Sequence, residues 1–279
     1  MTMLFDSPVL KIISLALLLA LIVFSVLPFL WMAGTSFKTA DEVYTSPPTW
    51  VPAHPSLANY GYILKRGPFD LYFRNSFLVG IGTTGLALTV SVLAGYGFSR
   101  FRMPGRNCLL FGFLMAQMFP SVLLIIPLFK MVKSLNLMNT LYALILANMS
   151  FAVPLCTWLI KGFFDQIPYE LEEAAVIDGC SRLGAMTRVA LPTARPGIAA
   201  AGIYVFIGAW DEFVYALTFT SRDAVRTLPI GLQRFTTSYE VQWSHMAAAT
   251  VLVTVPVVAL FLFIQRYLAQ GMLAGATKG

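Results

Sequence analysis

The sequence predicts an all-α, polytopic membrane protein with six transmembrane helices. Of its 279 residues, 58% are hydrophobic and only 11% are charged, whereas soluble domains carry roughly 25% charged residues. Apolar runs long enough to cross a bilayer core of about 30 Å recur along the chain. The charged residues gather between these runs, which is the pattern of a multi-pass membrane protein rather than of a soluble enzyme.

Six apolar runs meet the length that a membrane helix requires. The predicted spans are residues 12–36, 75–98, 107–129, 138–160, 196–220 and 246–266. The first run is too long for the apolar region of a signal peptide, and no A-x-A cleavage site follows it, so a retained helix is predicted. The fifth is apolar except for the adjacent Asp211 and Glu212 near its far end.

Six spans place both termini on the same side of the membrane. Lysine and arginine are almost evenly divided between the two sides, but Arg100, Arg102 and Arg106 crowd one short turn against two helix ends. Because positive loops stay in the cytoplasm, this density favours cytoplasmic termini. The net charge of +6 is therefore typical of membrane loops and does not indicate nucleic-acid binding.

A polar insert at 162–195 separates the fourth and fifth spans and is predicted to form two short helices joined by a turn. Pro168 suits a first helical position, and glutamates follow it where the helix dipole favours negative charge. Gly179 supplies a left-handed stop, Ser181 can cap the second helix, and Pro192 is expected to end it. Neither helix is long enough to span a membrane.

Two interpretations of this hairpin are open from the residues alone. It could be a solvated connection between spans. Alternatively, Ala174 and Ala175, beside Leu171 and Ile177 and bracketed by carboxylates, could let a partner surface approach closely.

The spacing within the insert is specific. It reads Glu173-Ala174-Ala175, three residues, Gly179, nine residues, Val189, one residue, Leu191-Pro192. This resembles the EAA loop of permease subunits from binding-protein-dependent ABC importers, with valine in place of isoleucine. Pro168 and Asp178 match the subset that imports carbohydrates.

Two further segments resemble the same subset. They are GAWDEFVYALTF from Gly208, where asparagine usually stands in place of Asp211, and the tail QRYLAQGMLAGATKG from Gln265. Nearly the whole chain is similar to the smaller, six-helix permease of maltose-type importers. The resemblance implies the type I importer fold and location in the cytoplasmic (inner) membrane of a prokaryote.

The resemblance also implies a mechanism and partners. The EAA loop would form a coupling helix seated in a separate cytoplasmic ATPase, and ATP would be bound by that partner, so no cofactor is expected here. A second permease subunit forming a heterodimer, two ATPase subunits and an extracytoplasmic substrate-binding protein are implied. The expected ATPase-coupling residues are Glu172, Glu173, Ala174, Ala175, Asp178, Gly179, Leu191 and Pro192, and the C-terminal tail 267–279 would add Gly275, Lys278 and Gly279.

Features of an enzyme are missing from the sequence. No G-x-x-x-x-G-K-[ST] motif occurs, so no ATPase site is predicted. His54 and His245 lie far apart, and the three cysteines form no C-x-x-C pair, so neither a catalytic group nor a metal site is expected.

Polar and aromatic residues within the spans are candidates for a substrate pathway. The set is Gln117, Asn148, Trp210, Asp211, Glu212 and Tyr215. Each has a structural alternative: the amides could serve helix packing, the carboxylates could pair with arginine or cap backbone groups, and the aromatic rings could be interface anchors.

Three rival functions remain at this point. The same machinery could import another solute, such as glycerol phosphate. A proton-coupled secondary transporter could use Asp211 or Glu212, although no internal repeat is visible. A scaffold protein without transport would leave those carboxylates unexplained.

Overall fold

The computed structural model describes residues 8–236 and 241–276, which are predominantly helical. The chain forms two compact units, residues 1–67 with 232–255 and residues 68–231 with 256–279. The predicted all-α class is confirmed within the described residues.

The first unit contains α1 and the beginning of the last helix. The predicted first span corresponds to α1, whose apolar side chains are largely exposed, as expected of a lipid-facing helix. Asn59 donates hydrogen bonds to the carbonyls of Ser36 (2.9 Å) and Lys38 (2.8 Å), and so orders the chain that leaves α1. The helices of this unit are α1 (Pro8–Ser36), α2 (Ala40–Val43), α3 (Ala58–Arg66) and α14 (Trp243–Ala276) as far as Val255.

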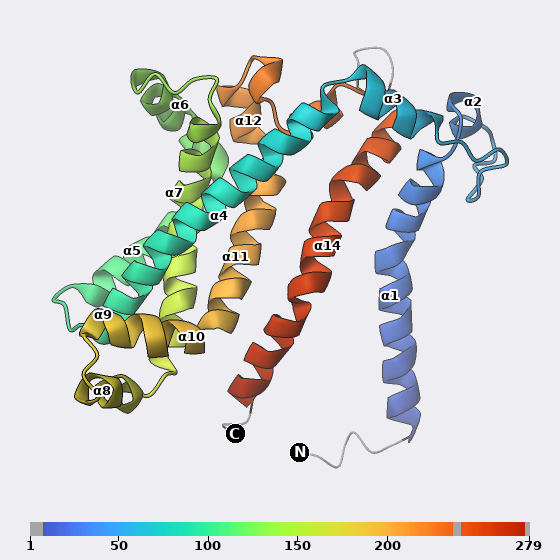
Figure 1. The fold of residues 1–279 in the computed structure, drawn as a ribbon. Helices are drawn as coiled ribbons and strands as arrows, with labels where there is room; N and C mark the ends of the chain where they lie inside the picture. The colour runs from blue at the N-terminus through green and yellow to red at the C-terminus, as the bar shows by residue number, and fades with distance from the viewer. Residues whose placement is uncertain (1–7, 237–240, 277–279) are drawn as a thin grey trace. The chain divides into compact units, whose positions relative to one another are not determined.

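The second unit is a bundle built on α4, α7 and α11, which run side by side in Figure 1. Short helices lie at its two ends, with α8 and α9 at one end and α6 and α12 at the other. Its elements are α4 (Phe69–Arg100), α5 (Arg106–Met118), η2 (Ser121–Leu124), α6 (Ile125–Ser134), α7 (Leu141–Asp165), α8 (Tyr169–Ile177), α9 (Arg182–Ala185), η3 (Met186–Ala190), α10 (Leu191–Thr193), α11 (Arg195–Trp210), α12 (Val214–Phe219), η4 (Asp223–Val225) and α13 (Leu228–Gln233).

Small residues allow the bundle helices to approach closely. A methyl group on Gly95 of α4 would lie 3.1 Å from the backbone nitrogen of Lys161 in α7. A methyl group on Gly197 of α11 would lie 2.2 Å from the ring of Phe163. Ser91 of α4 also donates a hydrogen bond to the carbonyl of Val153 (3.2 Å). Close backbone approach and hydrogen bonds between helices hold such bundles together where lipid removes the hydrophobic drive.

Four of the described helices are long and apolar enough to cross a membrane, or up to six if each of two bent pairs counts as one span. The predicted span 107–129 is interrupted in the structure, since α5 ends at Met118 and the next segment turns by 97°. Pro120 lacks a backbone donor and disfavours helical geometry at Phe119, which explains the break.

The predicted span 196–220 is also interrupted. The helix α11 ends at Trp210, and the chain passes Asp211 and Glu212 before α12 begins at Val214. The two carboxylates favour this break because charged groups are costly inside an apolar helix.

Other boundaries extend beyond the predicted ones. α4 begins at Phe69 and reaches Arg100, and α7 continues to Asp165 and so takes in the start of the predicted loop 162–195. α14 remains helical to Ala276, through most of the predicted tail 267–279.

Candidate functional site

The first part of the hairpin has the predicted local structure. α8 begins directly after Pro168, and Glu170 and Glu172 lie in its first turn. Gly179 has a φ of +93°, the left-handed conformation that ends helices. The Ser181 hydroxyl accepts a hydrogen bond from the backbone N–H of Gly184 (3.1 Å) and so caps the second helix. These features follow from residues within a few positions of one another. The Gly179 stop and the Ser181 cap are confirmed, whereas Pro168 stands at the N-cap, one residue before the predicted first helical position.

The second helix of the hairpin does not stop at Pro192. It runs from α9 through the π-helical turn η3 into α10, which ends at Thr193. The N–H of Leu191 reaches the carbonyl of Met186, five residues back, and this wider turn accommodates the proline that follows. The chain then bends by 74° between Thr193 and Arg195 into α11.

Most of the predicted coupling residues lie at the surface of the hairpin. Glu173, Ala174, Asp178 and Gly179 are exposed, whereas Ala175, Leu191 and Pro192 are half-buried. Large apolar side chains stand exposed around them, with 84% of Ile177 and 65% of Leu183 accessible. An exposed apolar surface flanked by carboxylates is typical of a site that binds another protein.

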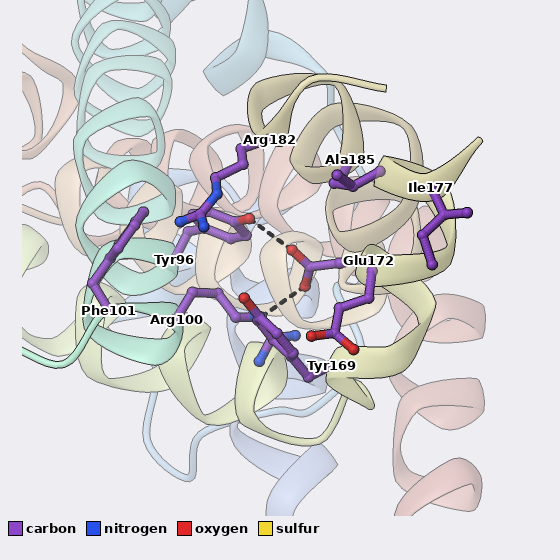
Figure 2. A pocket seen from close by; sticks show the side chains of 10 residues that line it. Tyr96, Arg100, Phe101, Tyr169, Glu172, Ile177, Arg182 and Ala185 are labelled. Carbon is purple, nitrogen blue, oxygen red and sulfur yellow. Dashed lines mark hydrogen bonds and ion pairs between the residues drawn. The ribbon is translucent and has the colours of Figure 1, made fainter. Parts of the chain in front are cut away.

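Glu172 differs from the other predicted coupling residues, because it is almost wholly buried. Only 4% of it is exposed. Its Oε1 accepts from Arg100 Nε (2.7 Å) and its Oε2 accepts from the Tyr96 hydroxyl (2.6 Å), as Figure 2 shows. Arg100 and Tyr96 belong to the end of α4, so Glu172 joins two elements of this protein. The prediction missed this because adjacent carboxylates in a sequence do not reveal which one is buried.

A second polar contact fixes the same end of the bundle. Asp165, at the end of α7, accepts from the Ser99 hydroxyl (2.7 Å) and forms an ion pair with Lys161. The guanidinium of Arg100 also donates to the carbonyl of Ile167 (3.0 Å), just before α8. The ends of α4 and α7 and the entry to α8 are therefore joined by side chains. The only sequence signal for this was the run of arginines from Arg100, which was used for orientation alone.

A cleft of about 440 Å³ lies elsewhere in the second unit. It brings together four of the six predicted pathway residues, namely Gln117, Asn148, Glu212 and Tyr215. The amide of Gln117 donates to the carbonyl of Phe151 (2.6 Å), and that of Asn148 donates to the carbonyl of Leu144 (2.9 Å). Neither amide oxygen has a hydrogen-bond partner among the described residues, and the described residues that line the cleft include no lysine or arginine.

Glu212 caps α12 in this cleft. Its two carboxylate oxygens accept from the backbone N–H groups of Tyr215 (2.6 Å) and Ala216 (3.0 Å). The expected capping role is thus confirmed, and arginine pairing is not seen among the described residues. The Tyr215 side chain stacks on Phe151 and Phe219, and its hydroxyl is buried without a hydrogen-bond partner in the described part of the chain.

Trp210 and Asp211 do not line the cleft. Trp210 has no exposed surface and packs between Phe73 and Phe206, with ring centroids 5.6 Å from each. Asp211 follows the last turn of α11. It is exposed and does not belong to the residues that line the cleft. Trp210, a predicted pathway residue, therefore lies in the core and outside the lining of this cleft.

The tail residues are described only in part. Gly275 lies within α14, whereas Lys278 and Gly279 lie outside the described residues.

Comparison with known proteins gives the class to which this bundle and hairpin belong. Residues 87–274 match the family model of the binding-protein-dependent transport system inner membrane component. The chain belongs to this family, and is a permease component of an ABC transporter.

Relatives of known description cover almost the whole chain. It is 40% identical to the sulfoquinovosyl glycerol transport system permease protein SmoH of Agrobacterium fabrum, over 93% of this chain and 91% of the relative. It is 36% identical to the trehalose/maltose transport system permease protein MalG of Thermococcus litoralis, over 95% of each chain.

The fold is also found in a solved structure. A chain of a bacterial ABC transporter involved in the import of the acidic polysaccharide alginate matches with a TM-score of 0.81 at 19% identity, covering 93% of this chain and 96% of that one. This match establishes the fold of the present chain.

Proposed function

We propose that this chain is the transmembrane permease subunit of an ATP-driven importer for a sugar or sugar derivative, coupled to a separate cytoplasmic ATPase through the hairpin 162–195. The observation that carries the coupling is the exposed face of the hairpin, where Glu173 and Ala174 stand beside the accessible apolar Ile177 and Leu183. The carbohydrates named for several relatives support the substrate class.

The proposal includes an assembly. A second permease subunit completes the pathway as a heterodimer, two ATPase subunits bind the hairpins and the tail, and an extracytoplasmic binding protein delivers the substrate. The assembly lies in the cytoplasmic membrane of a prokaryote with both termini of this chain in the cytoplasm. Catalysis of ATP hydrolysis belongs to the ATPase subunits.

Glu173→Lys is expected to abolish capture of the ATPase. A reversed charge on a docking face costs several kcal/mol, so recovery of the ATPase with a tagged chain from native membranes should fall by about tenfold or more. The control is Asp70→Lys, which reverses a carboxylate charge in the same way. Asp70 is exposed in the first turn of α4, about 30 residues and about 45 Å along the helix from Arg100. Equal recovery with Glu173→Lys and the control would contradict docking through this face.

The cleft is the proposed substrate contact of this subunit. The amide oxygens and the Tyr215 hydroxyl, which have no hydrogen-bond partner among the described residues, suit sugar hydroxyl groups, and the stacked aromatic rings suit a sugar ring. The described residues of the lining include the carboxylate of Glu212 and no lysine or arginine, so a cation for a solute such as glycerol phosphate would have to come from the second permease subunit. Proton coupling at Glu212 is disfavoured because both its oxygens already bind the backbone.

Tyr215→Phe is expected to lower uptake while leaving stability unchanged. The lost hydroxyl has no hydrogen-bond partner among the residues that the structure describes, whereas one hydrogen bond to a substrate contributes about 0.5–1.5 kcal/mol, or roughly twofold to tenfold in uptake. The probe is the sugar carried by the binding protein that co-purifies with the complex. Tyr142→Phe, on a residue of α7 that is 70% exposed, is the control. Unchanged uptake would exclude the Tyr215 hydroxyl from the pathway.

A further inference from the structure

The junction between α4 and α8 consists of hydrogen bonds and an ion pair between buried side chains. Glu172 uses both carboxylate oxygens, one for Arg100 and one for Tyr96. The side chains of Arg100 and Glu172 are only 9% and 5% exposed. A buried ion pair whose members also satisfy their remaining hydrogen-bonding groups has one preferred geometry, because any displacement leaves a charge unpaired away from water.

Neighbouring groups restrict the Arg100 side chain further. Its other nitrogens donate to Ser99 Oγ (3.2 Å) and to the Ile167 carbonyl (3.0 Å), and its guanidinium lies 5.9 Å from the centre of the Tyr169 ring. The Tyr96 ring packs edge-on against Phe164 of α7 (5.5 Å). Each side chain of the junction is therefore held by more than one contact, and Figure 2 shows the two bonds that Glu172 accepts from Arg100 and Tyr96.

The position of the junction gives it a mechanical consequence. Arg100 is the last residue of the 32-residue α4, the longest helix of the bundle unit. Glu172 and Glu173 are adjacent on α8 and point about 100° apart, so one can face the bundle while the other faces outward. The hairpin thus has an inner carboxylate bonded to a long membrane helix and an outer carboxylate in solvent.

We propose that Glu172 is a positioning residue that locks the hairpin to α4 through Arg100 and Tyr96, so that movement of the docked hairpin is transmitted directly to this membrane helix. This inference rests on the proposed function, because it assigns the two adjacent glutamates different tasks within it. Glu173 contacts the ATPase, whereas Glu172 makes α8 and α4 move as one body.

The test compares the same substitution at the two positions. Glu172→Gln and Glu173→Gln each remove one negative charge with little change of shape. Each is placed in a chain carrying Cys108→Ser, Cys156→Ala and Cys180→Ser, with nitroxide labels on cysteines at Thr187 of the hairpin and Leu93 of α4, both exposed. The whole complex is purified through the tagged chain, and the distance between labels is measured by pulsed electron paramagnetic resonance, without nucleotide and with ATP and vanadate.

The two variants are expected to show opposite defects. Glu172→Gln should recover the ATPase to within about twofold of the unchanged chain, since it lies outside the docking face. Its label distances should broaden and should shift when ATP and vanadate bind, whereas the unchanged chain keeps one narrow distribution in both states. Glu173→Gln should keep the narrow distribution but lose ATPase by about tenfold. Tyr96→Phe removes one of the two hydrogen bonds to Glu172 and should broaden the label distances less. It replaces Glu172→Gln in the test if that variant does not fold.

Each of the other outcomes contradicts either the positioning role of Glu172 or the proposed function. If Glu172→Gln loses the ATPase and keeps narrow distances, Glu172 is a docking contact and the inference is overturned. If neither Glu172→Gln nor Tyr96→Phe changes the distances, the junction does not lock the hairpin. If the unchanged chain recovers no ATPase, the proposed function itself fails, and the transmitting role fails with it.

Discussion

Arg100→Ala is expected to lower the free energy of unfolding by about 3–5 kcal/mol, because it leaves the carboxylate of Glu172 buried without its cation. Removing one member of a buried pair is costlier than losing the pair, since the remaining charge cannot regain water. The loss is measured by reversible denaturation of the purified protein in mixed detergent micelles. Arg102→Ala, on an exposed residue of the same turn, is the control and should change stability by less than about 0.5 kcal/mol.

A combined variant separates stability from coupling at this junction. Arg100→Met, Glu172→Leu and Tyr96→Phe together replace the three bonded polar side chains by apolar side chains of similar size, an exchange that is often neutral for a buried ion pair. The triple variant should therefore be more stable than Arg100→Ala while still allowing the hairpin to move against α4. If Arg100→Ala lowers the free energy of unfolding no more than Arg102→Ala does, the ion pair between Arg100 and Glu172 is hydrated in the folded protein.

Trp210→Ala is expected to destabilise the bundle by about 3–5 kcal/mol, the usual cost of truncating a large buried aromatic side chain. Trp210 is fully buried and contacts Phe73 and Phe206 through its ring, so the substitution opens a cavity between α4 and α11. The same denaturation measurement applies.

Trp210→Phe distinguishes packing from a role in the pathway. The indole N–H has no hydrogen-bond partner in the described part of the chain, so phenylalanine loses only part of the packed volume. Stability should fall much less than with alanine, and sugar uptake should persist. Normal stability combined with lost uptake would restore Trp210 as a pathway residue.

The sequence predicted those features that depend on near neighbours. The left-handed Gly179 and the Ser181 cap need only the residues within about three positions, whose preferences are strong. The apolar runs likewise identified the bundle helices, because hydropathy reports composition over a window of about 20 residues. Composition says nothing of direction, so the bend after Met118 and the break after Trp210 were absent from the prediction, although Pro120 and Asp211 were visible signals.

Contacts between distant residues were beyond prediction. Glu172 meets Arg100 across 72 residues, and nothing local distinguishes its carboxylate from that of Glu173. The cleft shows the same limit: polar residues in different helices could be named, but only the packing of α5, α7 and α12 places Gln117, Asn148 and Tyr215 in one lining and leaves Trp210 outside it.

The nine residues between Gly179 and Val189 run into the π-helical turn from Met186 to Ala190, which affects the geometry of the spacing. A π-turn holds one residue more than an α-turn, so the same axial distance in a regular helix needs a chain one residue shorter. Deleting one residue within this turn would therefore close it to a regular α-turn and leave the rest of the helix near its present direction. If the wide turn persisted after a deletion, everything beyond it would rotate by about 100°, and the half-buried Leu191 would exchange its place with a neighbour. The wide turn thus takes up one residue of the spacing without changing the direction in which α11 leaves the hairpin.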